Sequence, residues 1–225
     1  MQFEGFIYGS SKPAPAPARK TRRIEIYGDS ISAGYGNEAK ENGFRLNEEN
    51  VDKTYGAFAA AALDAEYTII ALSGHGMYKS LSQSTTEVTP KYFDRILYKN
   101  ETFYKFDQPA PDVVIIHLGT NDANMNVDMQ DYRKAYLHFV ARIRRQYPDA
   151  YIVCTTAGGN TTVWDTIDEV VEYRQKLYND EKIGHFVYMY DDIIGTTGAD
   201  GHPSVYGHKQ IGAALADYIC EELGW

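Results

Sequence analysis

The sequence predicts an α/β fold of three layers, in which helices cover both faces of a doubly wound, flavodoxin-like sheet of five parallel strands. Two observations predict it. Short strand-like runs alternate with longer segments of helical spacing, and residues 113–118 (Val-Val-Ile-Ile-His-Leu) are almost wholly apolar, as in a strand buried on both faces. Because crossovers between parallel strands are right-handed, the predicted strand order is 2-1-3-4-5.

Strand and helix signals follow each other along the chain without an internal repeat. Strands are expected at 23–27, 66–72, 113–118, 151–155 and 186–190. Helices are expected at 54–65, at 165–178 and over two segments whose apolar residues are spaced for one helix face: Tyr132, Tyr136, Phe139, Val140 and Ile143, and then Val205, Ile211, Leu215 and Ile219. Residues 40–52 are polar and are expected to form a loop.

The length of 225 residues suits one domain. Residues 11–18 (Ser-Lys-Pro-Ala-Pro-Ala-Pro-Ala) have the composition of an extended, semi-rigid linker. We therefore expect an N-terminal segment with its linker over residues 1–20 and a single folded domain over residues 21–225.

Composition and charge exclude several classes of function. The net charge of −9 argues against a nucleic-acid partner, which needs a concentrated basic surface. No apolar run approaches the ~20 residues that span a bilayer, and the first residues lack the pattern of a signal peptide. Cys154 and Cys220 have no metal-ligand spacing, and the histidines are scattered, so we expect neither a metal nor another cofactor.

Unusual polar residues follow the predicted strands. In a doubly wound sheet, ligands bind at the carboxyl ends of the strands, so these residues are expected to meet. Four motifs stand at such positions: 28–32 (Gly-Asp-Ser-Ile-Ser), 73–76 (Ser-Gly-His-Gly), 119–122 (Gly-Thr-Asn-Asp) and 200–203 (Asp-Gly-His-Pro). Each motif alone is typical of a turn or a helix cap, but their combination at strand ends favours a catalytic site.

The residue types suit acyl transfer. A serine hydroxyl is a weak nucleophile, so it needs a base within hydrogen-bond reach and an acceptor that orients this base. Ser30 is the candidate nucleophile, His202 the base and Asp200 the acceptor. The backbone N–H groups of Ser30 and Gly74 and the side-chain amide of Asn121 are candidate donors to the oxyanion of the intermediate.

The order of these motifs resembles that of the GDSL/SGNH hydrolases, over roughly residues 23–222. The resemblance implies the SGNH hydrolase fold, Ser30 as nucleophile, His202 as base, and Gly74 and Asn121 as oxyanion donors. The longer stretches 28–38 and 71–78 resemble carbohydrate esterase family 2. That resemblance implies an acetylesterase that acts on xylan or mannan, and a secreted or cell-surface protein.

The sequence departs from these families in two respects. Many SGNH hydrolases space the acid and the base as Asp-x-x-His, whereas here the spacing is Asp200-x-His202. A backbone carbonyl, Asp191 or Asp192 could orient the imidazole instead. Members of carbohydrate esterase family 2 usually carry a β-sandwich domain before the hydrolase domain, and residues 2–7 resemble the tail of such a domain.

Two aromatic residues, Tyr35 and Trp164, are candidates for binding a sugar ring, because both are expected in loops at the catalytic edge. The expected partner is an acetylated polysaccharide or oligosaccharide. A lipid esterase or thioesterase, which needs a long apolar acyl channel, and a non-catalytic glycan-binding relative are the alternatives.

Overall fold

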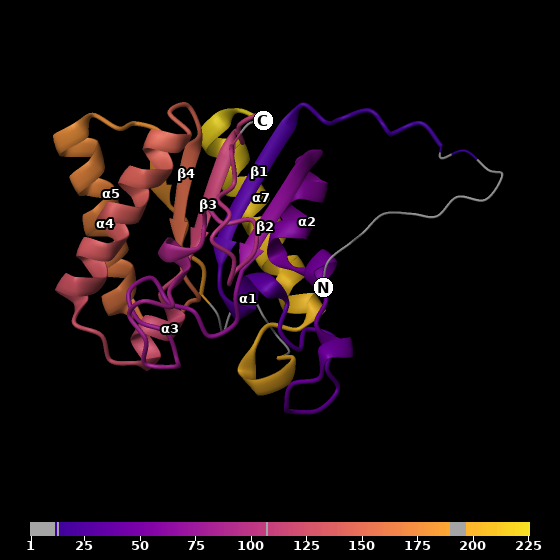
Figure 1. Ribbon diagram of the computed structural model, residues 1–225, viewed down its shortest axis with the longest axis horizontal. Helices are drawn as coiled ribbons and strands as arrows, with labels where there is room; N and C mark the ends of the chain where they lie inside the picture. The colour runs from indigo at the N-terminus through magenta and orange to yellow at the C-terminus, as the bar shows by residue number, and fades with distance from the viewer. Residues whose placement is uncertain (1–11, 13, 107, 190–196) are drawn as a thin grey trace.

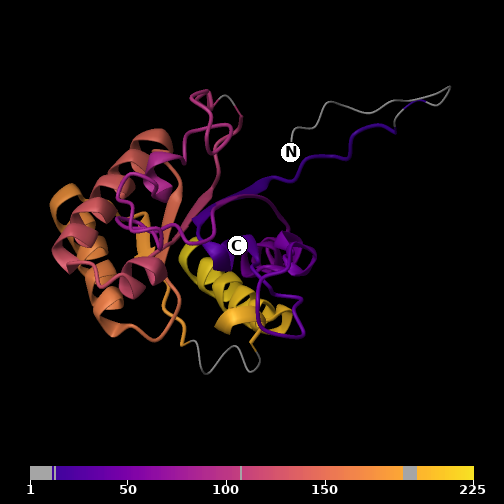
Figure 2. The same cartoon turned by 60° about the horizontal axis from the view of Figure 1, so that its bottom comes forward.

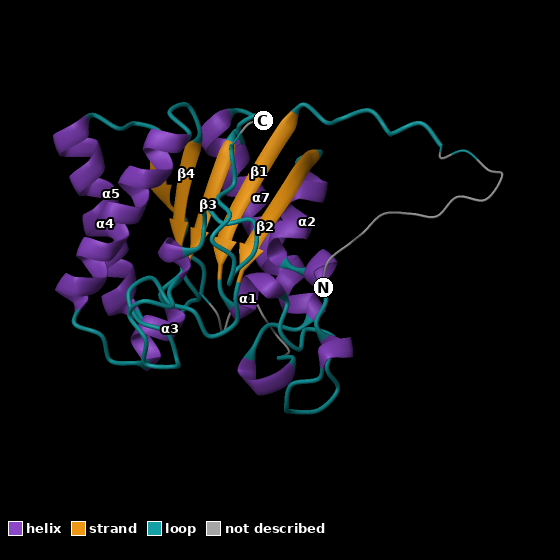
Figure 3. Cartoon of the chain, viewed as in Figure 1, coloured by secondary structure: helices purple, strands orange, loops and turns teal. Residues whose placement is uncertain are grey.

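The computed structural model describes residues 12, 14–106, 108–189 and 197–225. Its centre is a parallel five-stranded sheet with the strand order β2-β1-β3-β4-β5, which confirms the predicted topology (Figure 3). The strands are β1 (Arg22–Gly28), β2 (Ala65–Ala71), β3 (Val113–His117), β4 (Tyr151–Thr155) and β5 (Ile183–His185).

Helices cover both faces of the sheet, as Figures 1 and 2 show. On one face, α4 (Met129–Gln146) and α5 (Thr161–Tyr178) enclose an apolar core with alternate residues of β1, β3 and β4, such as Tyr27, Ile116 and Cys154. On the other face, α2 (Tyr55–Ala62) and α7 (Val205–Leu223) pack on the remaining strand residues. Burial of all five residues of β3 follows from this double cover.

Shorter helical elements complete the part of the chain that the structure describes. They are α1 (Ser30–Ala33), η1 (Leu46–Glu48), η2 (Val51–Lys53), η3 (Thr89–Lys91), α3 (Thr120–Asn124) and η4 (Ala199–Gly201). Of these, α1 begins two residues after the end of β1, α3 begins three residues after the end of β3, and η4 contains Asp200 and Gly201 of the motif 200–203. None of the helices in the described ranges is long and apolar enough to cross a lipid bilayer.

The fifth strand differs from the prediction of 186–190. It lies at Ile183–His185 and pairs with β4, and the last backbone hydrogen bond of this pair runs from Phe186 N to Cys154 O. Phe186 and Tyr188 are buried and Val187 and Met189 are exposed, so the alternation that predicted a strand is present without a β-ladder. Residue 190 lies outside the described residues.

Two helix boundaries also differ from the prediction. Helix α2 ends at Ala62 because Asp64 adopts a left-handed φ of 49° and turns the chain into β2. Helix α5 begins at Thr161, four residues before the predicted start, because the Asn160 side chain accepts a hydrogen bond from Val163 N and caps the helix.

The strands β1 to β4 lie within one residue of their predicted bounds.

Candidate active site

The four motifs meet at the carboxyl edge of the sheet. A cavity of about 270 Å³ opens there, and the predicted residues Ser30, Asn121, Asp200 and His202 all line it. Its remaining lining includes the apolar side chains of Ile31 and Leu81 and, after β4, the small residues Ala157 and Gly158. The position agrees with the rule that doubly wound sheets bind ligands at the carboxyl ends of their strands.

Ser30 is the first residue of α1, directly after β1. The Asp29 side chain caps this short helix by accepting from Ile31 N at 3.1 Å. A side chain on Gly28 would overlap the side chain of Ser32, so only glycine fits at this strand end. The turn therefore fixes the backbone of Ser30 and leaves its side chain half-buried at the cavity.

His202 lies 172 residues after Ser30, and the fold places their side chains in contact. His202 Nε2 is 2.8 Å from Ser30 Oγ, and His202 Nδ1 is 3.2 Å from the carbonyl oxygen of Ala199. A carbonyl oxygen can only accept, so Nδ1 carries the proton and Nε2 is the acceptor of the serine hydroxyl. This is the tautomer that a general base requires.

The environment of His202 favours its neutral form. Burial lowers the pKa of the imidazole below its usual value, whereas the Ala199 and Asp200 backbone and the charge of Asp200 act in the opposite direction. The net shift is downward, so the ring is largely unprotonated at neutral pH.

The Asp200 carboxylate points elsewhere. It accepts hydrogen bonds from the Tyr35 hydroxyl at 2.9 Å and from Gly43 N at 3.2 Å. Asp200 has a left-handed φ of 51° in the turn before His202. In this conformation its side chain bonds to the segment that contains Tyr35 and Gly43. The prediction had the Asp200 carboxylate as the acceptor for the ring, but among the described residues Nδ1 lies against the Ala199 carbonyl and the carboxylate bonds to Tyr35 and Gly43. Asp191 and Asp192 lie outside those residues.

The two other predicted oxyanion donors come from the ends of β2 and β3. Gly74 has a positive φ of 79°, a conformation that favours glycine. Asn121 Nδ2 donates to the carbonyl oxygen of His75 at 2.8 Å and, more weakly, to Asp29 Oδ2 at 3.3 Å. The Asn121 amide thus joins the loop of Gly74 to the turn of Ser30. The donor roles of Gly74 and Asn121 stay predictions.

Asp122 has a structural role that the sequence did not reveal. Its buried carboxylate accepts from three consecutive backbone N–H groups, those of Met77, Tyr78 and Lys79, at 2.7 to 2.8 Å. Burial raises the pKa of this carboxyl, and the three N–H donors oppose the shift. Asp122 therefore fixes the loop that follows Gly74, from a position adjacent to Asn121.

Of the two aromatic candidates for sugar binding, Tyr35 contacts His202 beside the cavity, although it is not among the described residues that line it. The centroid of the Tyr35 ring is 4.4 Å from that of His202. The ring of Phe44, which is about half exposed, stacks on Tyr35 with the two centroids 4.8 Å apart. Trp164 lies within α5 instead of the predicted loop, and it is not among the described residues that line the cavity. Phe44 was not predicted as a site residue because it stands in a polar segment of the sequence.

The described residues include no group of three or more His, Cys, Asp or Glu side chains that could hold a metal ion. Cys154 is a buried residue of the core and Cys220 is half-buried in α7, and both are free thiols. Burial raises the pKa of the Cys154 thiol to about 12, which makes it unreactive.

A parallel α/β sheet with a serine and a histidine hydrogen-bonded at its carboxyl edge is an arrangement that serine hydrolases share. The profile of the GDSL-like lipase/acylhydrolase family matches residues 26–210, and the chain belongs to this family.

Similar proteins within this family are carbohydrate esterases. A solved family two carbohydrate esterase from Clostridium thermocellum, in complex with cellohexaose, matches with a TM-score of 0.91 and 32% identity, over 98% of this chain and 70% of that one. The cellulase/esterase CelE of Acetivibrio thermocellus is 32% identical, over 100% of this chain and 28% of that protein. An acetylxylan esterase/glucomannan deacetylase of Cellvibrio japonicus is 25% identical, over 94% of this chain and 60% of that protein. The chain thus spans less than two thirds of these curated relatives.

Proposed function

We propose that this chain is a serine esterase that removes O-acetyl groups from polysaccharides of the xylan or mannan type. The observation that carries the proposal is the 2.8 Å contact between Ser30 Oγ and His202 Nε2, at a cavity on the carboxyl edge of the sheet. The polysaccharide is supported by the relatives, one named acetylxylan esterase/glucomannan deacetylase and one solved with cellohexaose.

In the proposed reaction, Ser30 Oγ attacks the acetyl carbonyl while His202 Nε2 takes the hydroxyl proton. The oxyanion of the tetrahedral intermediate accepts from the backbone N–H groups of Ser30 and Gly74 and from the Asn121 amide. The bond between the acyl carbon and the sugar oxygen then breaks, and the imidazolium returns its proton to that oxygen. Water, activated by His202 in the same way, hydrolyses the acetyl-serine and releases acetate.

The size of the cavity favours a short acyl group over a fatty acyl chain. Its volume of about 270 Å³ lies just below the range of roughly 300–1,000 Å³ that is usual for drug-sized ligands. Ile31 and Leu81 offer apolar contact for a methyl group. The stacked rings of Tyr35 and Phe44, beside His202, offer a surface for the sugar that carries the acetyl group.

Two measurements test this function. We expect the chain to release acetate from acetylated xylan or glucomannan, and the rate on p-nitrophenyl esters to fall steeply from acetate to butyrate and octanoate. A chemically deacetylated sample of the same polysaccharide is the matched control for acetate release. A preference for octanoate would favour the lipid esterase, and binding of polysaccharide without turnover of any ester would favour the glycan-binding relative.

We further propose that the Ala199 carbonyl, and not the Asp200 carboxylate, orients the His202 imidazole. Asp200→Asn then lowers kcat for p-nitrophenyl acetate by less than about tenfold, whereas loss of an orienting acid costs about 10⁴-fold. In Asp200 the two hydrogen bonds go to different oxygens, Oδ2 for Tyr35 and Oδ1 for Gly43. The asparagine keeps an oxygen that can accept from Gly43 N, and its amide nitrogen can donate to the Tyr35 hydroxyl oxygen, so we expect the loop to be retained.

The same variant has a signature in the pH profile. Activity requires neutral His202, so the rate falls as the pH drops through the pKa of this residue, which lies below 6.5. Because the charge of Asp200 raises that pKa, Asp200→Asn moves the acidic limb to lower pH. Asp217→Asn, on the exposed side of α7, is the control and leaves the limb unchanged. A loss near 10⁴-fold would restore Asp200 as the orienting acid.

A further inference from the structure

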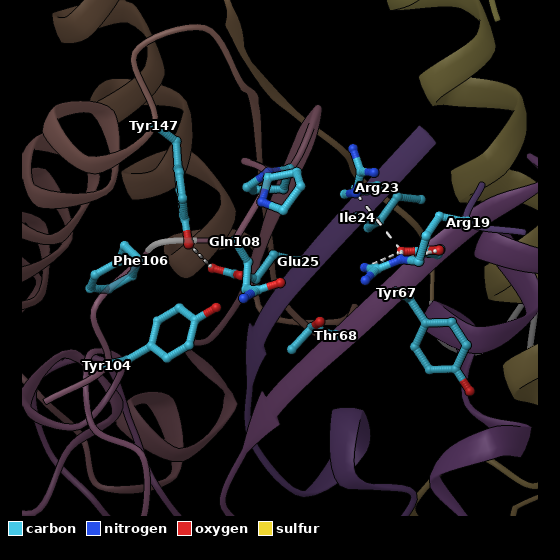
Figure 4. Close-up of a pocket in the computed structure, with 13 residues that line it drawn as sticks. Arg19, Arg23, Ile24, Glu25, Tyr67, Thr68, Tyr104, Phe106, Gln108 and Tyr147 are labelled. Atoms are coloured by element: carbon cyan, nitrogen blue, oxygen red, sulfur yellow. Dashed lines mark hydrogen bonds and ion pairs between the residues drawn. The ribbon is translucent and has the colours of Figure 1, made fainter. Parts of the chain in front are cut away.

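A second cavity, of about 190 Å³, lies on the face of β1 and β2 that carries Glu25 and Thr68 (Figure 4). Its wall comes from the chain before β3, with Tyr104, Phe106 and Gln108, and from Tyr147 at the end of α4. The described residues that line it are all different from those that line the cavity of Ser30 and His202. Catalysis as proposed above uses none of them.

Glu25 lies at the centre of this second cavity, between the aromatic wall and β2 (Figure 4). The hydroxyl groups of Tyr27 and Tyr147 both donate to its Oε1 atom. Its Oε2 atom accepts no hydrogen bond from any residue that the structure describes. Burial raises the pKa of the Glu25 carboxyl, and the two tyrosine donors oppose the shift. The side chain therefore offers a partly desolvated acceptor oxygen to a ligand.

The charges around the cavity balance. Arg19 makes a bidentate contact with Glu66 at 2.7 to 3.0 Å, and Arg23 Nε is 3.8 Å from the same carboxylate. Two arginines and two glutamates line the cavity, with no other charged side chain among its described residues, so the formal charge of the described lining is zero. An ion of either sign would gain little from this balance, whereas a neutral polar ligand suits it.

Donors and acceptors are both available to such a ligand. The Gln108 amide is exposed and makes no hydrogen bond with the described residues, and in Figure 4 it lies beside Glu25. Hydroxyl groups both donate and accept, and they can therefore use the Glu25 carboxylate and the Gln108 amide together.

The part of the wall formed by Tyr104, Phe106 and Tyr147 is aromatic. The rings of Tyr104 and Phe106 meet edge to face at 5.0 Å, and Phe106 meets Tyr147 in the same way at 5.9 Å. A pyranose ring has apolar C–H faces and a rim of hydroxyl groups, and it matches a site with aromatic rings on one side and polar planar groups on the other. The volume is below the roughly 300–1,000 Å³ of sites for drug-sized ligands, which suits a single ring.

We propose that this cavity is a non-catalytic binding site for one sugar ring of a neutral polysaccharide, separate from the cavity of Ser30 and His202. It holds the ring with the aromatic wall of Tyr104 and Phe106 and with the polar groups of Glu25 and Gln108. A site of this kind would keep the chain on its substrate between turnovers and raise the local concentration of acetylated sugars.

The test is a titration of the chain with unacetylated xylohexaose and cellohexaose, followed by the backbone amide shifts in NMR spectra. The choice of these sugars rests on the proposed function. We expect saturable shifts at residues 25, 68 and 108. Gln108→Ala and Glu25→Gln weaken this binding by about tenfold each, while p-nitrophenyl acetate turnover stays within about twofold. Glutamine at position 25 retains an oxygen that accepts from Tyr27 and Tyr147.

Gln130→Ala, which removes an exposed glutamine in the first turn of α4, is the matched control and leaves binding unchanged. Shifts confined to residues around Ser30, or equal affinity in the Gln108→Ala and Glu25→Gln variants, would overturn the proposal. The probes carry no ester, so a chain without esterase activity would contradict the proposed function and leave the binding result intact.

Discussion

Ser30→Ala and His202→Ala are each expected to lower kcat for p-nitrophenyl acetate by about 10⁴- to 10⁶-fold. The reason lies in the single hydrogen bond that joins their side chains: without the hydroxyl there is no nucleophile, and without the imidazole the hydroxyl keeps its proton. Because the two groups act as one unit, the double variant is expected to be no slower than the slower single variant.

The measurement is steady-state turnover at neutral pH, with circular dichroism to show that each variant folds. His138→Ala serves as the control, because His138 is exposed on α4 and is not among the residues that line the cavity of Ser30. It should retain full activity. If Ser30→Ala retained turnover close to that of the unaltered chain, the serine mechanism would be wrong.

Asn121→Ala is expected to lower kcat by about 10²- to 10³-fold with little change in KM, which is the usual cost of removing one oxyanion donor. The Asn121 side chain lines the cavity of Ser30 and is held by the His75 carbonyl and the Asp29 carboxylate. Because the two N–H groups of this amide already donate to His75 and Asp29, we expect the weaker bond to Asp29 to give way to the substrate oxygen as negative charge develops on it.

A second asparagine of α3 provides a matched control for that prediction. Asn124 also lines the cavity but is exposed at the end of the helix, and Asn124→Ala should change kcat by less than about threefold. Equal losses in the two variants would show that asparagine in α3 acts through the structure of the helix and not as an oxyanion donor. Thermal unfolding of both variants separates a loss of stability from a loss of chemistry.

The sheet could be predicted from the sequence because its signals are local. Residues 113–118 are apolar throughout, the helices repeat their apolar residues every three or four positions, and the handedness of crossovers leaves few strand orders. The meeting of Ser30, Asn121 and His202 followed from the same rule, because Ser30 and Asn121 stand within four residues of a strand end and His202 lies just before the last helix. The strand order and the shared edge are therefore consequences of pattern and topology.

Other features of the site depend on contacts between distant segments, which pattern does not reveal. The short spacing of Asp200 and His202 suggested a hydrogen bond, but the backbone dihedrals of Asp200 turn its carboxylate toward Tyr35 and Gly43. The predicted fifth strand had the correct alternation, yet only its preceding residues reach β4. Trp164 lies in helix α5 and not in a loop, because the Asn160 side chain caps the helix and it begins at Thr161.

Because the three backbone N–H groups after Gly76 donate to the Asp122 carboxylate, this loop is already ordered in the folded protein. Fixing the backbone of one residue costs roughly 1–2 kcal/mol of conformational entropy, so ordering a loop of this length at each turnover would be expensive. Here the loop loses this conformational entropy once, when the chain folds and the Asp122 carboxylate binds its backbone. Each arriving ester then encounters a loop that is already in place, and the rate of the reaction does not have to wait for it.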